Sequence, residues 1–147
     1  MDAHDIAVRN LTYRLFVDNG AAPSVADVAA AASVTVADAT ASWQRLHDAH
    51  AIVLQPDAIE LRMANPFSAI ATPYRVHTPG RSWYANCAWD AFGICAALHT
   101  DGRVETNCPE CGEAIACDVR DQQPIDKSLL FHCLVPAAQW WDDIVFT

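Results

Sequence analysis

Prolines divide this chain into two parts of different character. Asn65-Pro66 and Pro73 lie on either side of residue 70, and proline and the residue before it both favour extended backbone. Helical spacing of apolar residues dominates the part before them, and short β-rich runs dominate the part after. A chain of 147 residues can bury its core without disulfides. We therefore expect an α+β protein with one unit over residues 1–70 and another over residues 71–147.

The first unit is predicted to contain three helices followed by a small hairpin. Gly20 ends the first helix, and Ser24 and Thr35 are suitable N-caps for the second and third. A proline turn at Gln55-Pro56-Asp57 separates two short β runs. This order resembles a winged helix, in architecture only. The predicted helices cover residues 5–19, 25–32 and 36–49, the last with Ala39, Trp43, Leu46 and Ala49 on one side, and the predicted strands cover 51–54 and 59–63.

The charge of the chain argues against nucleic acid and membrane surfaces as partners. Residues 1–70 contain four arginines, no lysine and eight acidic residues, and the whole chain has a formal charge of -9. The third predicted helix carries two basic side chains, Arg45 and His47, and two acidic ones, Asp38 and Asp48. Acidic surfaces repel phosphate backbones and anionic headgroups. We expect the first unit to bury part of the second rather than to read DNA.

A thiol and a carboxylate lie three residues apart in the segment Tyr84-Ala-Asn-Cys-Ala-Trp-Asp90. A helix capped by Ser82 is predicted here, so Cys87 and Asp90 would share one face. Helix N-terminal N–H groups should lower the pKa of the Cys87 thiol, and burial should raise the pKa of Asp90. The alternatives are a merely buried cysteine and an aspartate that pairs with backbone or Arg81. The predicted buried stripe is Tyr84, Cys87, Ala91, Ile94 and Leu98.

Further cysteines follow in a part predicted to be β-rich. The turn Cys108-Pro-Glu-Cys-Gly112 has the form of half a zinc ribbon, with Cys117 and Cys133 available as further ligands. The alternative is a tight turn with buried or redox-active thiols. Cys95 is expected to pack in the core. The predicted strands are 103–106, 114–120 and 129–135, followed by a short helix from Pro136.

The ends of the sequence bear on its location. The N-terminus opens with the acidic Met1-Asp-Ala-His-Asp5 where a signal peptide needs basic residues, and no run approaches the roughly 20 apolar residues of a membrane span. We therefore expect a cytoplasmic protein with reduced thiols. The chain stops at Thr147 in an apolar run, which predicts a missing C-terminal segment.

The chain resembles the alkylmercury lyase family, the organomercurial lyases. The resemblance lies in the order of parts, in the Tyr-Ala-x-Cys-Ala-x-Asp segment and in the Leu-Val-Pro approach to the C-terminus. It implies protonolysis of a carbon–mercury bond without an organic cofactor. Cys87 would capture the organomercurial as a thiolate, and Asp90 would shuttle the proton and hold the mercuric product. A mercuric reductase is the expected recipient of that product.

The family also uses a second active-site cysteine, whose matching position falls just beyond Thr147. The chain is therefore either truncated or from a branch that has lost or moved this thiol. Cys133 is nearest to that place but does not match the motif, and Cys108 is the counterpart of a structural cysteine in the family. Two other functions stay open: a non-enzymatic protein binding zinc or mercury through Cys108, Cys111, Cys117 or Cys133, and a metal-sensing winged-helix regulator.

Overall fold

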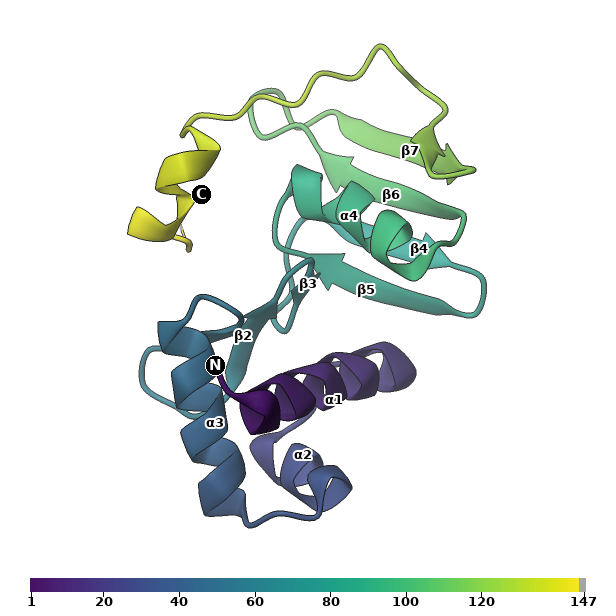
Figure 1. The fold of residues 1–147 in the computed structure, drawn as a ribbon. Coiled ribbons are helices and arrows are strands. Elements are labelled where there is room, and N and C mark those ends of the chain that lie inside the picture. Colours follow the sequence, from purple (N-terminus) through teal and green to yellow (C-terminus); the bar gives the residue numbers. More distant parts are fainter. Residues whose placement is uncertain (146–147) are drawn as a thin grey trace.

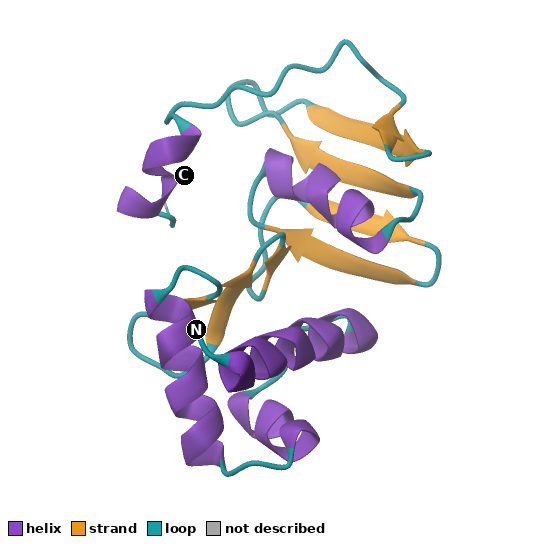
Figure 2. Ribbon diagram, in the orientation of Figure 1, coloured by secondary structure: helices purple, strands orange, loops and turns teal. Residues whose placement is uncertain are grey.

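The computed structural model describes residues 1–145, and its fold is α+β as predicted (Figures 1 and 2). Three helices form one end of the molecule, and a fourth helix covers one face of the antiparallel sheet. The helices are α1 (Ala3–Asn19), α2 (Val25–Ala32), α3 (Val36–Asp48), α4 (Ala88–Leu98) and the 3-10 helix η1 (Ala137–Asp142). The strands are β1 (Val53–Leu54), β2 (Leu61–Ala64), β3 (Phe67–Ser68), β4 (Arg75–Thr78), β5 (Arg81–Ala85), β6 (Gly102–Asn107), β7 (Ala114–Arg120) and β8 (Gln123–Pro124).

The three N-terminal helices begin and end close to where the sequence predicted. Gly20 ends α1 in the left-handed region with φ 71°. Ser24 and Asp27 form a capping box at the start of α2, and Thr35 accepts a hydrogen bond from the backbone N–H of Asp38 at the start of α3. On α3 the predicted apolar side is buried except for Ala49, which is exposed because it lies past the last helical turn.

All eight strands belong to one antiparallel sheet in the order β1-β2-β3-β5-β4-β6-β7-β8. The two-residue strand β3 connects the predicted hairpin β1–β2 to the rest, because it pairs with β2 on one side and with β5 on the other. The backbone hydrogen bonds therefore continue across the predicted boundary near residue 70. That boundary, like the winged-helix comparison, stays a prediction.

The predicted helix start at Ser82 is wrong. Residues Arg81–Ala85 form β5, whose Trp83 and Ala85 face the core in alternation, and helix α4 begins only at Ala88. Tyr84, predicted for the buried stripe of that helix, is instead a half-buried residue of β5, with the Arg75 guanidinium 4.3 Å from its ring centre. A hairpin between Thr78 and Arg81 explains the difference, because pairing with β4 satisfies the backbone that a helix would otherwise have used.

The strand predicted over residues 129–135 is also wrong. The chain turns back at Asp121 and Gln122, which both have positive φ, and then pairs with β7 only at Gln123 and Pro124. One more backbone hydrogen bond follows, from the N–H of Ile125 to the carbonyl of Asp118 at 2.9 Å. Residues 126–135 then leave the sheet as irregular chain, and the predicted terminal helix appears as η1, with Pro136 at its N-cap. The predicted truncation after Thr147 concerns positions outside the described residues.

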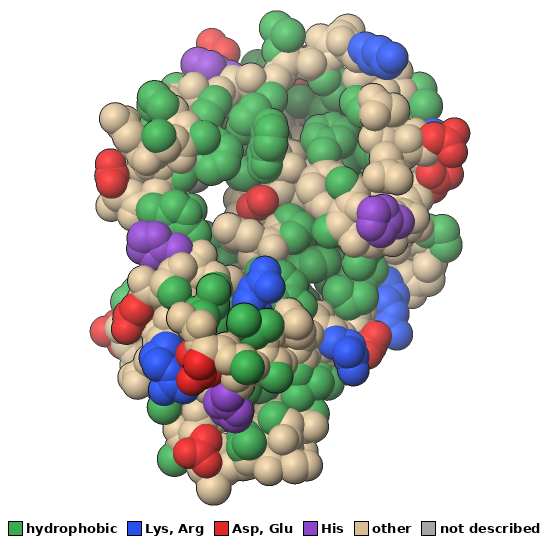
Figure 3. Space-filling model, in the orientation of Figure 1, with side chains coloured by type: hydrophobic (Ala, Val, Ile, Leu, Met, Phe, Trp, Pro, Cys, Tyr) green, Lys and Arg blue, Asp and Glu red, His purple; other side chains and the backbone are tan. Residues whose placement is uncertain are grey.

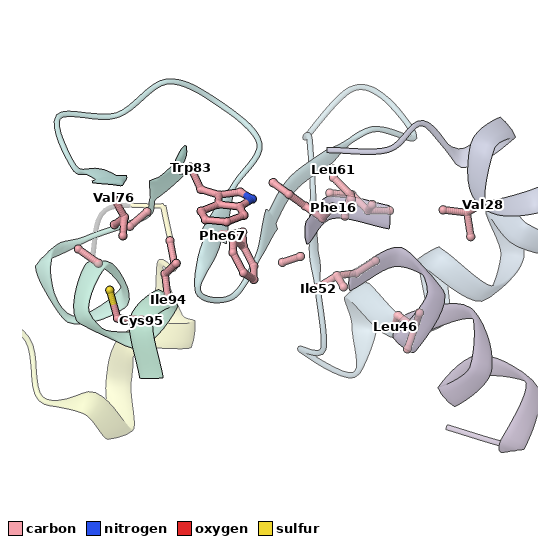
Figure 4. Packing of buried hydrophobic residues seen from close by; sticks show 14 of the residues in the cluster. Phe16, Val28, Leu46, Ile52, Leu61, Phe67, Val76, Trp83, Ile94 and Cys95 are labelled. Carbon is pink, nitrogen blue, oxygen red and sulfur yellow. The ribbon is translucent and has the colours of Figure 1, made fainter. Parts of the chain in front are cut away.

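One hydrophobic core runs through both parts of the molecule (Figure 4). Phe67 stands at its centre, with its ring 5.3 Å from Phe16 of α1 and 5.9 Å from Trp83 of β5, measured between ring centres. Val28 and Leu46 lie toward the helical end, while Ile94 of α4 lies beyond Trp83. The three aromatic rings thus join the helical unit to the sheet and to α4.

An ion pair fixes α1 against α3. The Asp5 carboxylate is only 2% exposed and accepts hydrogen bonds from Arg45, the shortest 2.7 Å long, while Arg45 also donates to Ser42. The guanidinium holds the pKa of Asp5 down, at about 2. Arg45, one of two basic side chains considered for DNA contact, is therefore committed to this pair. Within residues 1–145, no helix is long and apolar enough to cross a bilayer.

Replacing Asp5 with asparagine should lower the free energy of unfolding at pH 7 by about 1–3 kcal/mol, because it removes the buried partner of Arg45. Since folding lowers the pKa of Asp5, the wild-type pair stabilises fully above about pH 5 and loses this contribution as the pH falls toward 2. Urea unfolding should therefore show the two proteins converging in acid. Asp18→Asn, at an exposed position on the same helix, is the matched control. A constant difference from pH 7 to pH 3 would contradict the assignment.

Candidate functional site

Cys87 occupies the junction between β5 and α4. Its backbone is extended, with φ -151° and ψ -177°, and its carbonyl accepts the first hydrogen bond of the helix from the N–H of Ala91 at 2.9 Å. The N-cap position leaves the N–H groups of Trp89 and Asp90 facing the sulfur, although no capping hydrogen bond forms. The junction places Asp90 one turn into α4, so both side chains emerge from the same end of the helix.

Cys87 and Asp90 line one cavity with a volume of about 370 Å³. Asn86 and Tyr74 lie on the same side of it, and the opposite wall comes from the C-terminal segment, residues 125–145. Figure 3 shows this face of the molecule hollowed between that segment and the rest of the chain, with hydrophobic side chains around the hollow. The predicted meeting of the thiol and the carboxylate is therefore confirmed, and their chemical roles stay predictions.

The expectation of a lowered pKa at Cys87 is wrong. Burial raises the pKa of this thiol and is the largest effect on it. The facing N–H groups of Asp90 and Trp89 lower the pKa, but the negative charges of Asp90 and Cys133 raise it further. Desolvation and like charges therefore outweigh the helix N-terminus, and the free protein holds Cys87 mainly as a thiol at neutral pH.

Burial also raises the pKa of Asp90, as expected from the sequence. The Asn86 amide opposes this effect by donating a hydrogen bond of 2.9 Å to Asp90 Oδ2, and the Cys87 thiol opposes it too. Arg81, considered as a partner for Asp90, instead donates to the carbonyl of Val17 at 3.2 Å. Asp90 is thus a half-buried acid that is held by the neutral amide of Asn86, and Arg81 does not pair with it.

Hydrogen bonds connect Asp90 to the N-terminal helices through Asn86. Besides Asp90, the Asn86 amide nitrogen donates to Oδ1 of Asn65 at 3.1 Å and to the carbonyl of Pro66 at 3.4 Å. Three acceptors around one nitrogen fix the orientation of this amide. The carbonyl of Asn65 in turn accepts from the hydroxyl of Tyr13 on α1 at 3.0 Å. The helical unit therefore helps to position the acid.

The cysteines proposed for zinc do not meet in one site. Cys108 and Cys111 lie in the β6–β7 turn, where Gly112 has φ +75°, whereas Cys117 is buried in β7 and Cys133 lies at the cavity. Among the described residues, no group of three or more His, Cys, Asp or Glu side chains is placed to hold a metal ion. The predicted closed zinc site is therefore not supported.

The remaining thiols have distinct surroundings. The backbone N–H groups of Cys111 and Glu110 lower the pKa of Cys108, so the turn favours a thiolate there. Cys95 is fully buried, as predicted, and packs so closely on β6 that a side-chain carbon at Gly102 would lie 2.7 Å from its sulfur. Cys95 is therefore a core residue.

Asn86 and Tyr74 are cavity residues that were not predicted from the sequence, whereas Cys133 was considered as a zinc ligand and as the cysteine nearest to the place of the second active-site thiol. Asn86 stands directly before Cys87, so its place in the motif was an available signal. Tyr74 reaches the site because β4 pairs with β5, and Cys133 reaches it through a long irregular connection. Contacts of this kind depend on the tertiary fold and leave no local pattern.

A search of curated proteins gives no match. The solved structure of the mercury-bound form of MerB2 matches with a TM-score of 0.67 and 20% sequence identity, over 86% of this chain and 60% of that one. The present chain thus spans 60% of the length of the MerB2 chain, and this likeness supports the fold.

A sequence match carries the family assignment. The model of the family described as MerB, alkylmercury lyase, matches residues 67–147, a range that includes β3 to η1, with Cys87 and Asp90. This range is more than half of the chain, and it begins at the strand that joins the two parts of the sheet. The chain therefore belongs to the alkylmercury lyase family.

Proposed function

We propose that this protein is an organomercurial lyase that cleaves a carbon–mercury bond by protonolysis, with Cys87 and Asp90 as its catalytic residues. The observation that carries the proposal is the shared cavity, in which a thiol and an acid of raised pKa face the same space. Membership of the alkylmercury lyase family supports it. The substrate is a small organomercurial, and the reaction needs no organic cofactor.

Capture of the substrate falls to Cys87. Mercury is a soft metal and prefers thiolate sulfur to oxygen or nitrogen ligands. When the Cys87 sulfur binds the organomercurial cation, its proton is displaced. Asp90 is the acceptor, because it lies in the same cavity and its own pKa is raised. Binding thus places the proton on the group that the next step needs.

Cleavage then requires that proton to reach carbon. Asp90 gives its proton to the carbon bound to mercury, the electron pair of the carbon–mercury bond forms the new carbon–hydrogen bond, and the hydrocarbon leaves. Asp90 becomes a carboxylate beside the mercuric ion, which compensates its charge. The neutral Asn86 amide holds the carboxyl group in place without trapping it as a permanent ion pair.

The walls of the cavity suit an organic group on mercury. Phe131, Leu134 and Trp140 supply apolar surface opposite the β5–α4 junction, and the volume of about 370 Å³ is in the range of small-molecule sites. Apolar walls also exclude water, which strengthens the interaction between the acid and the reacting carbon. We propose that the reaction takes place in the cytoplasm and that a mercuric reductase accepts the mercuric product.

We also propose a division of labour between the two parts of the chain. Residues 71–147 form the lyase core, and the helical unit of residues 1–70 supports it. The match of the family from residue 67 onward and the contact of Tyr13 with Asn65 support this division.

Substitution of each catalytic residue should separate activity from stability. Cys87→Ser and Asp90→Asn should each reduce methane release from methylmercury by roughly 100-fold or more. Because folding raises the pKa of Asp90, burying its charge opposes folding above its ordinary pKa, so Asp90→Asn should not lower the unfolding free energy at pH 7. Gas chromatography and urea unfolding measure the two effects. Cys111→Ser is the matched control, because this exposed cysteine lies outside the cavity. Full activity in Asp90→Asn would refute the proposal.

The pH dependence of kcat/KM should reflect the ionisation of both Cys87 and Asp90. The reactive form combines the Cys87 thiolate with a protonated Asp90. It carries the same number of protons as the dominant form, in which Cys87 is a thiol and Asp90 is a carboxylate. The kcat/KM should therefore rise through the pKa of Asp90, above its usual range, and fall only through the raised pKa of Cys87. Steady-state rates at fixed external thiol test this. An acid limb that persists unchanged in the residual activity of Asp90→Asn would assign it to another group.

Asn86 should tune the acid. Removing its amide in Asn86→Ala takes away a hydrogen bond to the Asp90 carboxylate, so the pKa of Asp90 should rise and the acid limb of kcat/KM should move to higher pH. Activity at neutral pH should fall about 10-fold through loss of orientation. The control is Asn107→Ala, which removes an exposed amide that bonds the carbonyl of Gly112 far from Asp90. An unshifted acid limb would show that Asn86 has no part in setting the acid.

A further inference from the structure

The turn between β6 and β7 holds two thiols next to each other. Cys108 is half-buried and Cys111 is exposed, and neither lines the cavity of the candidate site, although Pro109 between them does. Backbone hydrogen bonds close the turn, because the N–H of Gly112 donates to the carbonyl of Cys108 at 2.9 Å and the N–H of Cys108 donates to the carbonyl of Glu113 at 2.8 Å. The positive φ of Gly112, 75°, completes it. The backbone therefore fixes both cysteines on one tight turn.

The spacing of the two cysteines suits a disulfide. Residues three positions apart on a tight turn have Cα atoms less than about 7 Å apart, and a disulfide joins Cα atoms about 4.4–6.8 Å apart. The side chains already interact, since a hydrogen bond with the Cys111 side chain is one of the causes that lower the pKa of Cys108. A bond between the two sulfurs therefore needs little movement of the backbone.

The turn also activates Cys108 as a nucleophile. The backbone N–H groups of Cys111 and Glu110 donate to its sulfur and lower the pKa of this thiol, although the charge of Glu110 opposes them. Burial, in contrast, raises the pKa of Cys87 and of Cys95. Because the thiolate is the attacking form, Cys108 has a larger reactive fraction at neutral pH than Cys87.

We propose that Cys108 and Cys111 form a redox-active dithiol that low-molecular-weight disulfides oxidise reversibly, with Cys108 as the attacking thiol and Cys111 as the resolving thiol. This site does not depend on the proposed lyase function. A closed metal site at the turn would need further ligands, which residues 1–145 do not supply, whereas a disulfide needs only the pair. A reducing compartment keeps such a pair reduced until small disulfides accumulate.

The exchange balances in atoms and electrons. The Cys108 thiolate attacks one sulfur of the small disulfide, forms a mixed disulfide with it and expels the other half as a thiolate. Cys111 then loses its proton to solvent, and its sulfur attacks the Cys108 sulfur and expels the second thiolate. The protein gives up two electrons and two protons, and the small disulfide, which is the oxidant, becomes two thiols.

The exposure of the two residues suits the return reaction. The sulfur of the exposed Cys111 is the accessible end of the disulfide, so an external thiolate attacks it. Cys108 then leaves as a thiolate, and a thiol of lowered pKa leaves faster. A second external thiolate releases Cys111 and regenerates the small disulfide. The turn can therefore be oxidised and reduced without a change elsewhere in the fold.

Peptide mapping locates the bond. The full chain is reduced in the presence of a chelator, desalted and treated with hydroxyethyl disulfide, a neutral probe that Glu110 and Glu113 do not repel. After acid quenching and blocking with N-ethylmaleimide, cleavage after glutamate separates residues 106–110 from residues 111–113. A disulfide joining these two peptides should form at least about 10-fold faster than any disulfide of Cys87. Oxidation of other cysteines while this pair stays reduced would overturn the proposal.

Single substitutions test the order of the two thiols. Cys111→Ser should stop at the mixed disulfide of Cys108 with half of the probe, seen by intact mass. Cys108→Ser should react at least about 10-fold more slowly at Cys111, because the activated thiol is gone. Cys133→Ser, which changes an exposed cysteine of another segment, is the matched control and should form the disulfide at the original rate. Equal rates in the first two variants would contradict the assigned roles.

A measurement on the unsubstituted chain needs no variant to fold. Brief labelling with iodoacetamide at neutral pH should modify Cys108 about 5-fold or more faster than Cys111, although exposure alone would favour Cys111. In concentrated urea the turn is lost and the two residues should be labelled at similar rates. Faster labelling of Cys111 in the folded chain, or the same ratio with and without urea, would overturn the role of the turn.

Discussion

The contact of Phe67 with Phe16 and Trp83 holds this protein together. Phe67 lies in a strand of only two residues, and backbone pairing of that length contributes little by itself. Its ring supplies the rest, because it packs against α1 on one side and β5 on the other. Fully burying such a side chain contributes about 1.5–3 kcal/mol. The short strand β3 can therefore join two halves that differ in secondary structure.

The same junction positions the acid of the site. Phe67 pairs with Ala85, so the residues that flank these two positions, Asn65-Pro66 and Asn86, lie next to each other. Asn86 then bonds Asn65 on one side and Asp90 on the other. A shift of one residue in this pairing would turn every side chain of β3 to the opposite face and break the connection. The geometry of the acid therefore depends on a core contact as much as on its own helix.

Interactions between residues near in sequence made much of the fold predictable, whereas features that depend on distant residues were not predicted. Ser24 and Thr35 cap their helices as predicted, because capping involves residues three positions apart. The start of α4 was missed, since Tyr84 fits a helical stripe while Trp83 and Ala85 fit an alternating strand, and only pairing with β4 decides between them. Helix geometry alone suggested a lowered pKa for Cys87, whereas burial by residues distant in sequence raises it. The position of Cys133 at the cavity could not be predicted, because it depends on the path of the long irregular segment that leads to it.

The two walls of the cavity are held by different forces, and this difference suits a binding site. Cys87 and Asp90 stand where a strand paired on both sides leads into a helix, so the backbone fixes their separation. The facing wall has no strand pairing between residues 125 and 135, and aromatic contacts such as that of Trp89 with Phe131 hold it. Displacing that wall breaks side-chain contacts but few backbone hydrogen bonds, which costs less free energy than disturbing the sheet. This wall can therefore move without moving the thiol and the acid apart.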